Sequence, residues 1–238
     1  MTIDVISVQP KMLEGFLTES ILGRAVRKGA LELHLVDLKD FGVGRWKKTD
    51  DKPYGGGPGM LMTCAPWFAA VEKCLGRTAD GKYAPGTRVI MTSPKGRKFT
   101  QRDAEALALE EHLVFLCGHY EGFDARIESL ATDFFSLGDF VMTGGELAAA
   151  AMTDAVSRLL PGVLGGGPAA TAAESFGADG LLEAPQYTHP PEFRGMKVSE
   201  VLLSGDHAKI EAWRKSEARK ETERLRPELA TFSKENNR

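Results

Sequence analysis

His112-Leu-Val-Phe-Leu-Cys117 opens the stretch of sequence that decides the fold, which continues to Arg158. Its length and its apolar, β-branched and aromatic side chains are typical of a buried strand. Gly118-His-Tyr-Glu-Gly-Phe-Asp124 follows at once, and in it two glycines enclose two ring side chains and a carboxylate. In open α/β sheets, ligands bind in the loops at the carboxyl ends of strands. We therefore expect a ligand-binding loop after this strand.

A second strand-to-loop corner follows closely. Phe135-Ser-Leu-Gly-Asp-Phe-Val-Met142 predicts another strand, and Thr143-Gly-Gly-Glu146 opens an Ala/Leu-rich helix that ends at Arg158. Each feature also has an ordinary structural explanation: Thr143 and Glu146 fit a capping box, and Arg158 would complement the helix dipole. The two corners taken together favour a ligand site.

The composition is that of a soluble globular protein, with 238 residues, 42% hydrophobic and 26% charged. A net charge of −3 neither indicates nor excludes nucleic-acid binding, because local patches matter more than totals. Cys64, Cys74 and Cys117 lack paired spacing, which favours a reducing compartment over a disulfide scaffold. The sequence shows no signal peptide, membrane span or metal-ligand spacing among its histidines, so we expect a cytoplasmic protein without a membrane anchor or structural zinc.

Strand and helix patterns alternate along the first part of the chain, which predicts an α/β domain with a largely parallel sheet. The helix expected from Pro10 to Gly29 should place Met12, Phe16, Ile21 and Leu22 in the core. The other expected strands are 2–8, 31–36 and 87–91, and the other expected helices are 63–75 and 100–111, the latter with Thr100 as N-cap.

Two further loops have compositions that indicate function. The long polar segment 37–60 contains Arg45-Trp-Lys-Lys48 and Tyr54-Gly-Gly-Gly-Pro-Gly-Met60. A structureless loop of that length is usually functional or disordered. Its basic and aromatic residues favour contact with a phosphate backbone, and a solvated loop is the alternative. Ser93-Pro-Lys-Gly-Arg-Lys98 is a third loop at the carboxyl end of a strand.

The last third of the chain changes character. Residues 162–180 lack regular patterns and include Glu174-Ser-Phe176, which is either in a plain linker or in a lid that brings a carboxylate to a pocket. Residues 209–226 carry seven Lys/Arg against four Glu, which indicates either a solvated face or an RNA-binding surface. We therefore divide the chain into an α/β domain (1–162), a flexible linker or lid (163–182) and a helical C-terminal domain (183–238).

Five motifs together resemble those of the bacterial tRNA (guanine-37, N1)-methyltransferase family, TrmD, of the SPOUT class. They span nearly the whole chain in the order of the family. The motifs are Tyr54-Gly-Gly-Gly-Pro-Gly-Met60, Cys117-Gly-His-Tyr-Glu-Gly122, Gly138-Asp-Phe-Val-Met-Thr-Gly-Gly-Glu146, Ser157-Arg-Leu-Leu-Pro-Gly-Val-Leu164 and Leu202-Leu-Ser-Gly-Asp-His207.

The resemblance implies a fold, a reaction and partners. The fold is a mostly parallel α/β sheet with a deep trefoil knot at its carboxyl edge, followed by a small helical C-terminal domain that binds tRNA. The reaction is methyl transfer from S-adenosylmethionine to N1 of guanine-37, in tRNA with G at nucleotides 36 and 37. Relatives act as homodimers whose active sites draw on both chains, and some are helped by Mg²⁺, for which the sequence shows no clear ligand set.

The resemblance also implies the residues that bind the cofactor. They fall in the three loops 93–96, 120–122 and 137–145, whose glycines allow a ligand to approach the backbone closely. Glu183, where the family usually has Asp, is a further candidate. The expected cofactor-binding residues are Ser93, Pro94, Gly96, Tyr120, Glu121, Gly122, Leu137, Gly138, Phe140, Met142, Gly144, Gly145 and Glu183.

Two residues are implied for the chemistry. N1 of guanine carries a proton at neutral pH, so methylation requires a general base and a positive group for the charge that spreads toward O6. The positive group of the family maps to Arg158. Its Asp base maps to Glu174, with one extra residue in the loop. A Glu is chemically equivalent as a base, so we expect Glu174 to take this role.

Three alternatives remain at this point. The protein could methylate another RNA, or it could be a catalytically silent RNA-binding homologue in which Glu174 marks lost chemistry. A hydrolase that uses Cys117 with His119 is the third, although no orienting group for that pair is evident. The presence of Arg158 and of the glycine loops favours an active methyltransferase.

Overall fold

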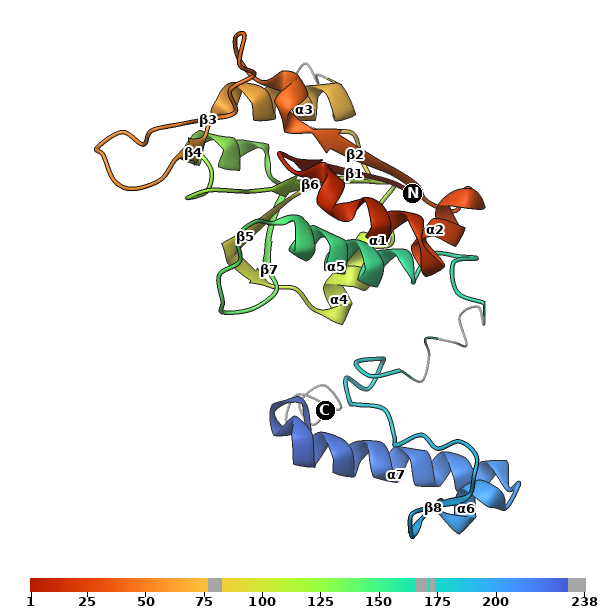
Figure 1. The fold of residues 1–238 in the computed structure, drawn as a ribbon. Helices are drawn as coiled ribbons and strands as arrows, with labels where there is room; N and C mark the ends of the chain where they lie inside the picture. The colour runs from red at the N-terminus through yellow and green to blue at the C-terminus, as the bar shows by residue number, and fades with distance from the viewer. Residues whose placement is uncertain (77–82, 166–170, 172–173, 231–238) are drawn as a thin grey trace. The chain divides into compact units, whose positions relative to one another are not determined.

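The chain forms two compact units, Met1–Gly165 and Gly166–Arg238 (Figure 1). The computed structural model describes residues 1–76, 83–165, 171 and 174–230. The first unit contains a five-stranded sheet with helices on both faces. The second contains a long helix, a short helix and a small hairpin.

All strands of the main sheet run parallel, in the order β2-β1-β6-β5-β7. Thr2 of β1 lies opposite Glu32 of β2 and His112 of β6, and His112 lies opposite Thr87 of β5. The carboxyl ends of the strands therefore meet at one edge. The strands are β1 (Thr2–Ser7), β2 (Glu32–Asp37), β5 (Thr87–Lys98), β6 (His112–Cys117) and β7 (Asp133–Ser136).

Two hydrophobic cores cover the two faces of the sheet. Successive residues of a strand point to opposite faces, so Leu113 and Phe115 of β6 pack into one core and Val114 and Leu116 into the other. The first core is closed by α1 (Glu14–Thr18), α2 (Ser20–Arg27), α4 (Gln101–Leu107) and α5 (Glu146–Ser157). The second is closed by the 3₁₀ helices η2 (Leu38–Phe41) and η3 (Ala125–Leu130) and by α3 (Cys64–Leu75).

The C-terminal unit is built on α7 (His207–Leu225), which Asp206 caps by accepting a hydrogen bond from the Lys209 N–H at 3.2 Å. The buried Thr222 Oγ1 accepts a hydrogen bond from the Leu182 N–H at 2.9 Å, which fastens the segment before the hairpin to this helix. The other elements of the unit are β8 (Glu192–Phe193), β9 (Met196–Lys197) and α6 (Glu200–Leu203). No helix in the described part of the chain is both long and apolar enough to span a membrane.

The prediction of one continuous helix from Pro10 to Gly29 is wrong, and so is part of the prediction of which of its residues are buried. The segment consists of η1 (Pro10–Leu13), α1 and α2, with an extended Glu19 between the last two. The break resets which residues face the sheet. Met12 and Phe16 are therefore 53% and 44% exposed, whereas the predicted Leu22 is buried.

The strand expected over 135–142 is also too long. β7 ends at Ser136, whose hydroxyl donates to the Gly138 carbonyl at 2.8 Å and turns the chain away from the sheet. β5, in contrast, continues through the expected loop to Lys98, with a shift in pairing to β7 between Thr92 and Arg97. The capping box at the start of α4, between Thr100 and Asp103, confirms the expected N-cap.

Candidate functional site

Two loops at the carboxyl edge of the sheet lie against each other, and the shifted part of β5 lies against β7. The Gly145 N–H donates to the Gly118 carbonyl at 2.9 Å, and Gly144 forms a β-bridge with His119. The shifted part of β5 passes so close to β7 that a Cβ on Gly96 would lie 2.5 Å from the Phe135 backbone nitrogen. The structure thus joins the loops after β6 and β7, which carry the predicted segments 120–122 and 137–145, and it places Gly96 of the predicted segment 93–96 against β7.

Close approach, and not an unusual backbone angle, requires glycine at positions 144 and 145. A Cβ on Gly145 would collide with Thr92 Oγ1 and would lie 3.0 Å from Cys117 Cα. A Cβ on Gly144 would lie 2.6 Å from His119 Nε2. The φ angle of Gly145 is −85°, which any residue can adopt. These two glycines therefore let the start of α5 pack directly onto the end of β6.

Glu146 forms a buried polar contact beneath these loops. Its side chain is 1% exposed and accepts a hydrogen bond from the Ser7 hydroxyl at the end of β1. His119 Nε2 lies 3.0 Å from the same carboxylate oxygen. The expected capping box with Thr143 is wrong, because Gly145 is the N-cap of α5 and no side chain caps it. Glu146 instead links the loop after β6 to the carboxyl end of β1.

The segment 59–62 holds the loop that carries Tyr120 and Glu121. The Glu121 N–H donates to the Met60 carbonyl at 3.0 Å, and the Met62 N–H donates to the Gly122 carbonyl at 2.9 Å. Tyr120 has a φ of +58°, and its side chain is exposed. Partial burial, and then the charge of Asp50, raise the pKa of the Tyr120 phenol further above neutral, where the hydroxyl is protonated and can donate a hydrogen bond.

The loop 137–142 presents an exposed aromatic ring. The Phe140 N–H donates to the Gly138 carbonyl at 3.0 Å, and a Cβ on Gly138 would lie 2.8 Å from Phe140 Cε1. Asp139 pairs with Lys98 at 2.7 Å, which ties this loop to the end of β5. Leu137 and Met142 pack partly into the core and anchor the two ends of the loop.

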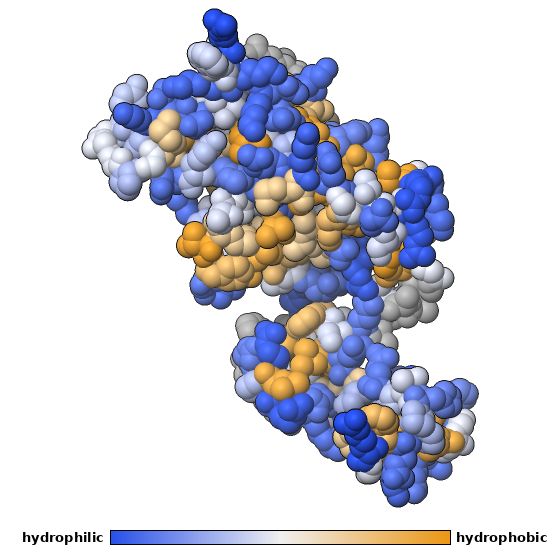
Figure 2. Space-filling view, viewed as in Figure 1, coloured by the Kyte–Doolittle hydropathy of each residue, from blue (hydrophilic) through white to orange (hydrophobic). Residues whose placement is uncertain are grey.

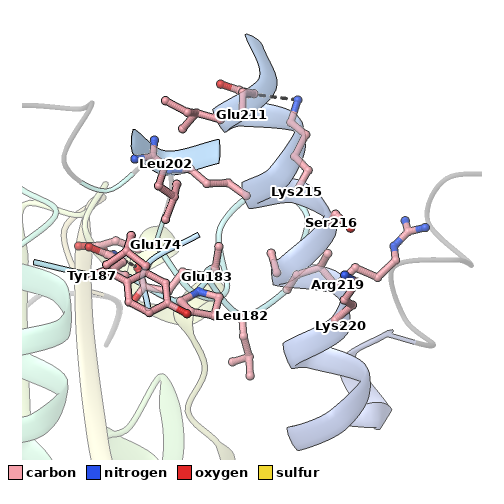
Figure 3. A pocket seen from close by; sticks show the side chains of 18 of the residues that line it. Glu174, Leu182, Glu183, Tyr187, Leu202, Glu211, Lys215, Ser216, Arg219 and Lys220 are labelled. Atoms are coloured by element: carbon pink, nitrogen blue, oxygen red, sulfur yellow. Dashed lines mark hydrogen bonds and ion pairs between the residues drawn. The ribbon is translucent and has the colours of Figure 1, made fainter. Parts of the chain in front are cut away.

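Glu174 and Glu183 lie in the C-terminal unit, where both line an open hollow of about 1420 Å³ (Figure 3). The hollow lies between the segment 174–191 and one side of α7, and Tyr187 forms part of its wall. Glu183 accepts a hydrogen bond from Gln186 at 2.8 Å, and its N–H donates to Ser175 at 3.1 Å. The structure thus groups these two carboxylates in one unit.

Arg158 belongs to the other unit. It is the C-cap of α5, and its N–H donates to the Asp154 carbonyl at 3.1 Å. The predicted site residues therefore fall into two sets. Arg158 and the three loops lie in the first unit, and the two glutamates lie in the second.

Comparison with known proteins identifies the family. The family model described as tRNA (Guanine-1)-methyltransferase TrmD matches residues 1–232. The chain belongs to this family. It is 49% identical to the tRNA (guanine-N(1)-)-methyltransferase of Symbiobacterium thermophilum, 50% to that of Geobacillus kaustophilus and 48% to that of a Thermus thermophilus strain. Each comparison covers 96% of this chain and 91% of the relative.

Membership of the TrmD family agrees with the environment of Cys117, which argues against the hydrolase alternative. The Cys117 thiol is fully buried, and burial together with the nearby charge of Glu146 raises its pKa well above the usual value. Its nucleophilic thiolate is therefore suppressed at neutral pH. His119 Nε2 lies 3.0 Å from the Glu146 carboxylate, as described above. Within the described residues, no group of three or more His, Cys, Asp or Glu side chains could hold a metal ion.

Replacing Gly145 should damage the cofactor site that the family resemblance implies. We expect Gly145→Ala to weaken S-adenosylmethionine binding at least tenfold, because the new methyl group must push apart the start of α5 and the end of β6. Titration calorimetry measures the affinity, and circular dichroism reports whether the fold persists. Gly165→Ala is the matched control, since no atom lies within 4 Å of a Cβ there. Equal binding by the two variants would contradict the requirement for close approach.

Cys117 should resist alkylation in the native protein. Because its pKa is raised, the thiolate forms only at a pH well above neutral, and burial also excludes the reagent. We expect iodoacetamide at about pH 8, below the usual thiol pKa, to leave Cys117 unmodified in the native state and to modify it in guanidinium chloride. Peptide mass spectrometry would detect the modification. Rapid native modification of Cys117 would show that the thiol is accessible and would revive the hydrolase alternative.

Proposed function

We propose that this protein transfers the methyl group of S-adenosylmethionine to N1 of guanine-37 in tRNA. The match to the TrmD family over residues 1–232 carries this conclusion. The curated relatives named above are tRNA (guanine-N(1)-)-methyltransferases of nearly the same length. The close approach of the glycine-containing loops at the edge of the sheet supports a ligand site there.

The three loops form a deep trefoil knot in this proposal. Support comes from the order β6-β5-β7, which sends the chain outward past β5 before α5 begins. The 137–145 loop must then return to the end of β6, where Gly145 bonds to Gly118. Such a return through neighbouring loops is rare in proteins, and membership of a SPOUT family is what makes it the expected arrangement here.

S-adenosylmethionine fits the polar and aromatic character of these loops. The cofactor supplies an electrophilic methyl group on a sulfonium centre. Backbone groups of 137–145 can bind its adenine edge, and the exposed ring of Phe140 offers an apolar surface beside it. The carboxylates of Glu121 and Glu183 suit its cationic amino acid end. The remaining residues proposed to bind it are Ser93, Pro94, Gly96, Tyr120, Gly122, Leu137, Gly138, Met142, Gly144 and Gly145.

The chemistry is assigned to Glu174 and Arg158. Glu174 accepts the N1 proton of guanine, and the Arg158 guanidinium stabilises the negative charge that develops toward O6. Both carry partly exposed side chains in their own units, as such roles require. The chain departs from the family in using Glu as the base. The extra methylene has to be accommodated by the segment around it, because the base must reach hydrogen-bonding distance of N1.

We propose that the protein acts as a homodimer, and the length of α5 supports this proposal. The helix begins beside the cofactor loops and has 12 residues, so Arg158 lies about 18 Å farther along its axis. This separation along the helix favours a second copy as the source of the Arg158 that acts beside the loops. Hydrophobic side chains gather over α1 and α5 on the face seen in Figure 2. Phe16 of α1 and Leu147 of α5 are exposed.

The C-terminal unit is proposed to contact the tRNA through its basic side chains. Several basic side chains of α7 pair with Glu within the helix, including Lys215 with Glu211 at 3.2 Å. Arg214 and Arg219 take part in no ion pair within the described residues, so they are available to phosphate groups. These residues also line the hollow that contains Glu174.

Methyl transfer to defined tRNA transcripts tests the proposed function. We expect labelled methyl to pass to a transcript with G at nucleotides 36 and 37 and not to the same transcript with A at 37. Replacement of Mg²⁺ by EDTA in a parallel reaction tests the metal requirement implied by the resemblance. Transfer to both transcripts would contradict the choice of guanine-37. Transfer to neither, with S-adenosylmethionine still bound, would favour another RNA or the silent RNA-binding homologue.

Substitution of the two assigned residues should slow chemistry more than binding. We expect Glu174→Gln to lower the single-turnover rate by about 10²- to 10⁴-fold, because it removes the base. Arg158→Ala should cost about 10²- to 10³-fold through loss of charge stabilisation. Glu174→Asp is the conservative control and should retain most of the rate. A Glu174→Gln variant with nearly full rate, or an Arg158→Ala variant that loses only cofactor affinity, would overturn the respective role.

A further inference from the structure

The segment 42–48 forms a small closed hairpin, which we call the Trp46 hairpin. Val43 and Lys48 exchange two backbone hydrogen bonds of 2.9 and 3.0 Å, and the Lys47 N–H donates to the Gly44 carbonyl at 3.1 Å. A Cβ on Gly42 would collide with the Lys47 carbonyl, so only glycine allows the two arms to close. The long loop expected over 37–60 therefore contains a defined turn with Trp46 at its tip.

Trp46 is exposed to an extent that is unusual for its size. Its residue surface is 82% exposed, whereas Trp67 is fully buried and Trp213 is partly buried. A large apolar ring held at the tip of a closed turn points to a partner that covers it. The Arg45 guanidinium lies 5.6 Å from the ring centroid, and the high exposure shows that it leaves most of the indole open.

The charges around Trp46 fit an anionic partner. Lys47 pairs with Asp40 at 2.8 Å, and this contact raises the pKa of the Lys47 ammonium. Lys48 lies 3.9 Å from Asp51, which is a weak contact between exposed groups. Arg45 has no carboxylate partner within the described residues. The ring is therefore flanked by cationic side chains, of which Arg45 is available for a phosphate.

The Trp46 hairpin also lies at the edge of the sheet that carries the candidate site. It follows η2, which begins directly after the carboxyl end of β2. Beyond the hairpin, β3 (Asp50–Asp51) pairs with β4 (Leu61–Met62), and Met62 bonds to the loop 118–122. Short hydrogen-bonded connections thus join the hairpin to the loop that carries Tyr120 and Glu121.

We propose that Trp46 is a stacking platform for an unpaired nucleotide of the RNA substrate, with Arg45 on the adjacent phosphate. The proposal rests on the proposed tRNA methylation. Aromatic rings flanked by cations are how proteins bind single-stranded nucleic acid, because every base has a π face and a phosphate beside it. A loop nucleotide next to the methylated guanine is unpaired and meets both requirements. The Trp46 hairpin thereby helps to hold the anticodon loop at the methyl-transfer site.

Tryptophan fluorescence and tRNA affinity test this role together. In a Trp213→Phe background, Trp46 is the exposed fluorophore and Trp67 is buried, so addition of the tRNA transcript should quench the long-wavelength emission. We expect Trp46→Ala to weaken tRNA binding about tenfold and to raise the KM for tRNA similarly, which is the usual effect of losing one stacked base. Trp46→Phe should stay within about threefold of the parent protein, because a smaller ring still stacks.

The controls separate stacking from damage to the hairpin. Val43→Ala truncates another exposed apolar side chain of the same hairpin and should leave tRNA affinity unchanged. The affinity for S-adenosylmethionine and the melting temperature should be the same in all variants. If the wild-type protein methylates tRNA and Trp46→Ala binds and methylates it equally well, stacking is overturned and the proposed function stands. If the wild-type protein neither binds nor methylates tRNA, both proposals fail.

Discussion

A Cβ on Gly145 would collide with Thr92 Oγ1 and come within 3.0 Å of Cys117 Cα, and this absence of space fixes how the carboxyl edge of the sheet is built. The start of α5 must lie directly on Thr92 in the middle of β5 and on the end of β6. The hydrogen bond from Gly145 to Gly118 then joins loops that follow different strands. The candidate cofactor site depends on this contact, because its walls are the backbones that the contact brings together.

Glu146 extends the same constraint to the first strand. A carboxylate with 1% exposure is costly to bury unless donors satisfy it. Here the Ser7 hydroxyl donates to Oε1 and His119 Nε2 lies 3.0 Å from the same oxygen, whereas Oε2 has no hydrogen-bond partner within the described residues. The side chain therefore couples β1, the loop after β6 and the first turn of α5. These contacts explain why a Glu follows the two glycines. Helix capping does not explain it, because the N-cap of α5 has no side-chain hydrogen bond.

The distribution of the site over two units has a consequence for function. The glycine-walled loops and Arg158 belong to one compact unit, and Glu174 and Glu183 belong to the other. Within the first unit, about 18 Å of helix separate Arg158 from the loops at the start of α5. The groups proposed for proton removal, charge stabilisation and methyl donation thus lie in separate parts of the chain. In the proposed enzyme, bringing them together is the task of a second copy and of the bound tRNA, to which the Trp46 hairpin adds a contact.

The sequence by itself determined the alternation of strands and helices, the parallel sheet and, through five ordered motifs, the family. β1, β2, β6 and α3 lie close to their expected bounds, because their patterns are local and apolar. The sequence also predicted glycine-rich loops at the ends of strands, because glycine is a local signal for a turn. Tertiary structure decided the end of β7 at Ser136, the extension of β5 to Lys98, the break at Glu19 and the burial of Glu146. The extension of β5 and the burial of Glu146 depend on contacts between residues far apart in the chain. Helical periodicity cannot show that a neighbouring strand blocks a Cβ, or that a serine 139 positions away will satisfy a carboxylate.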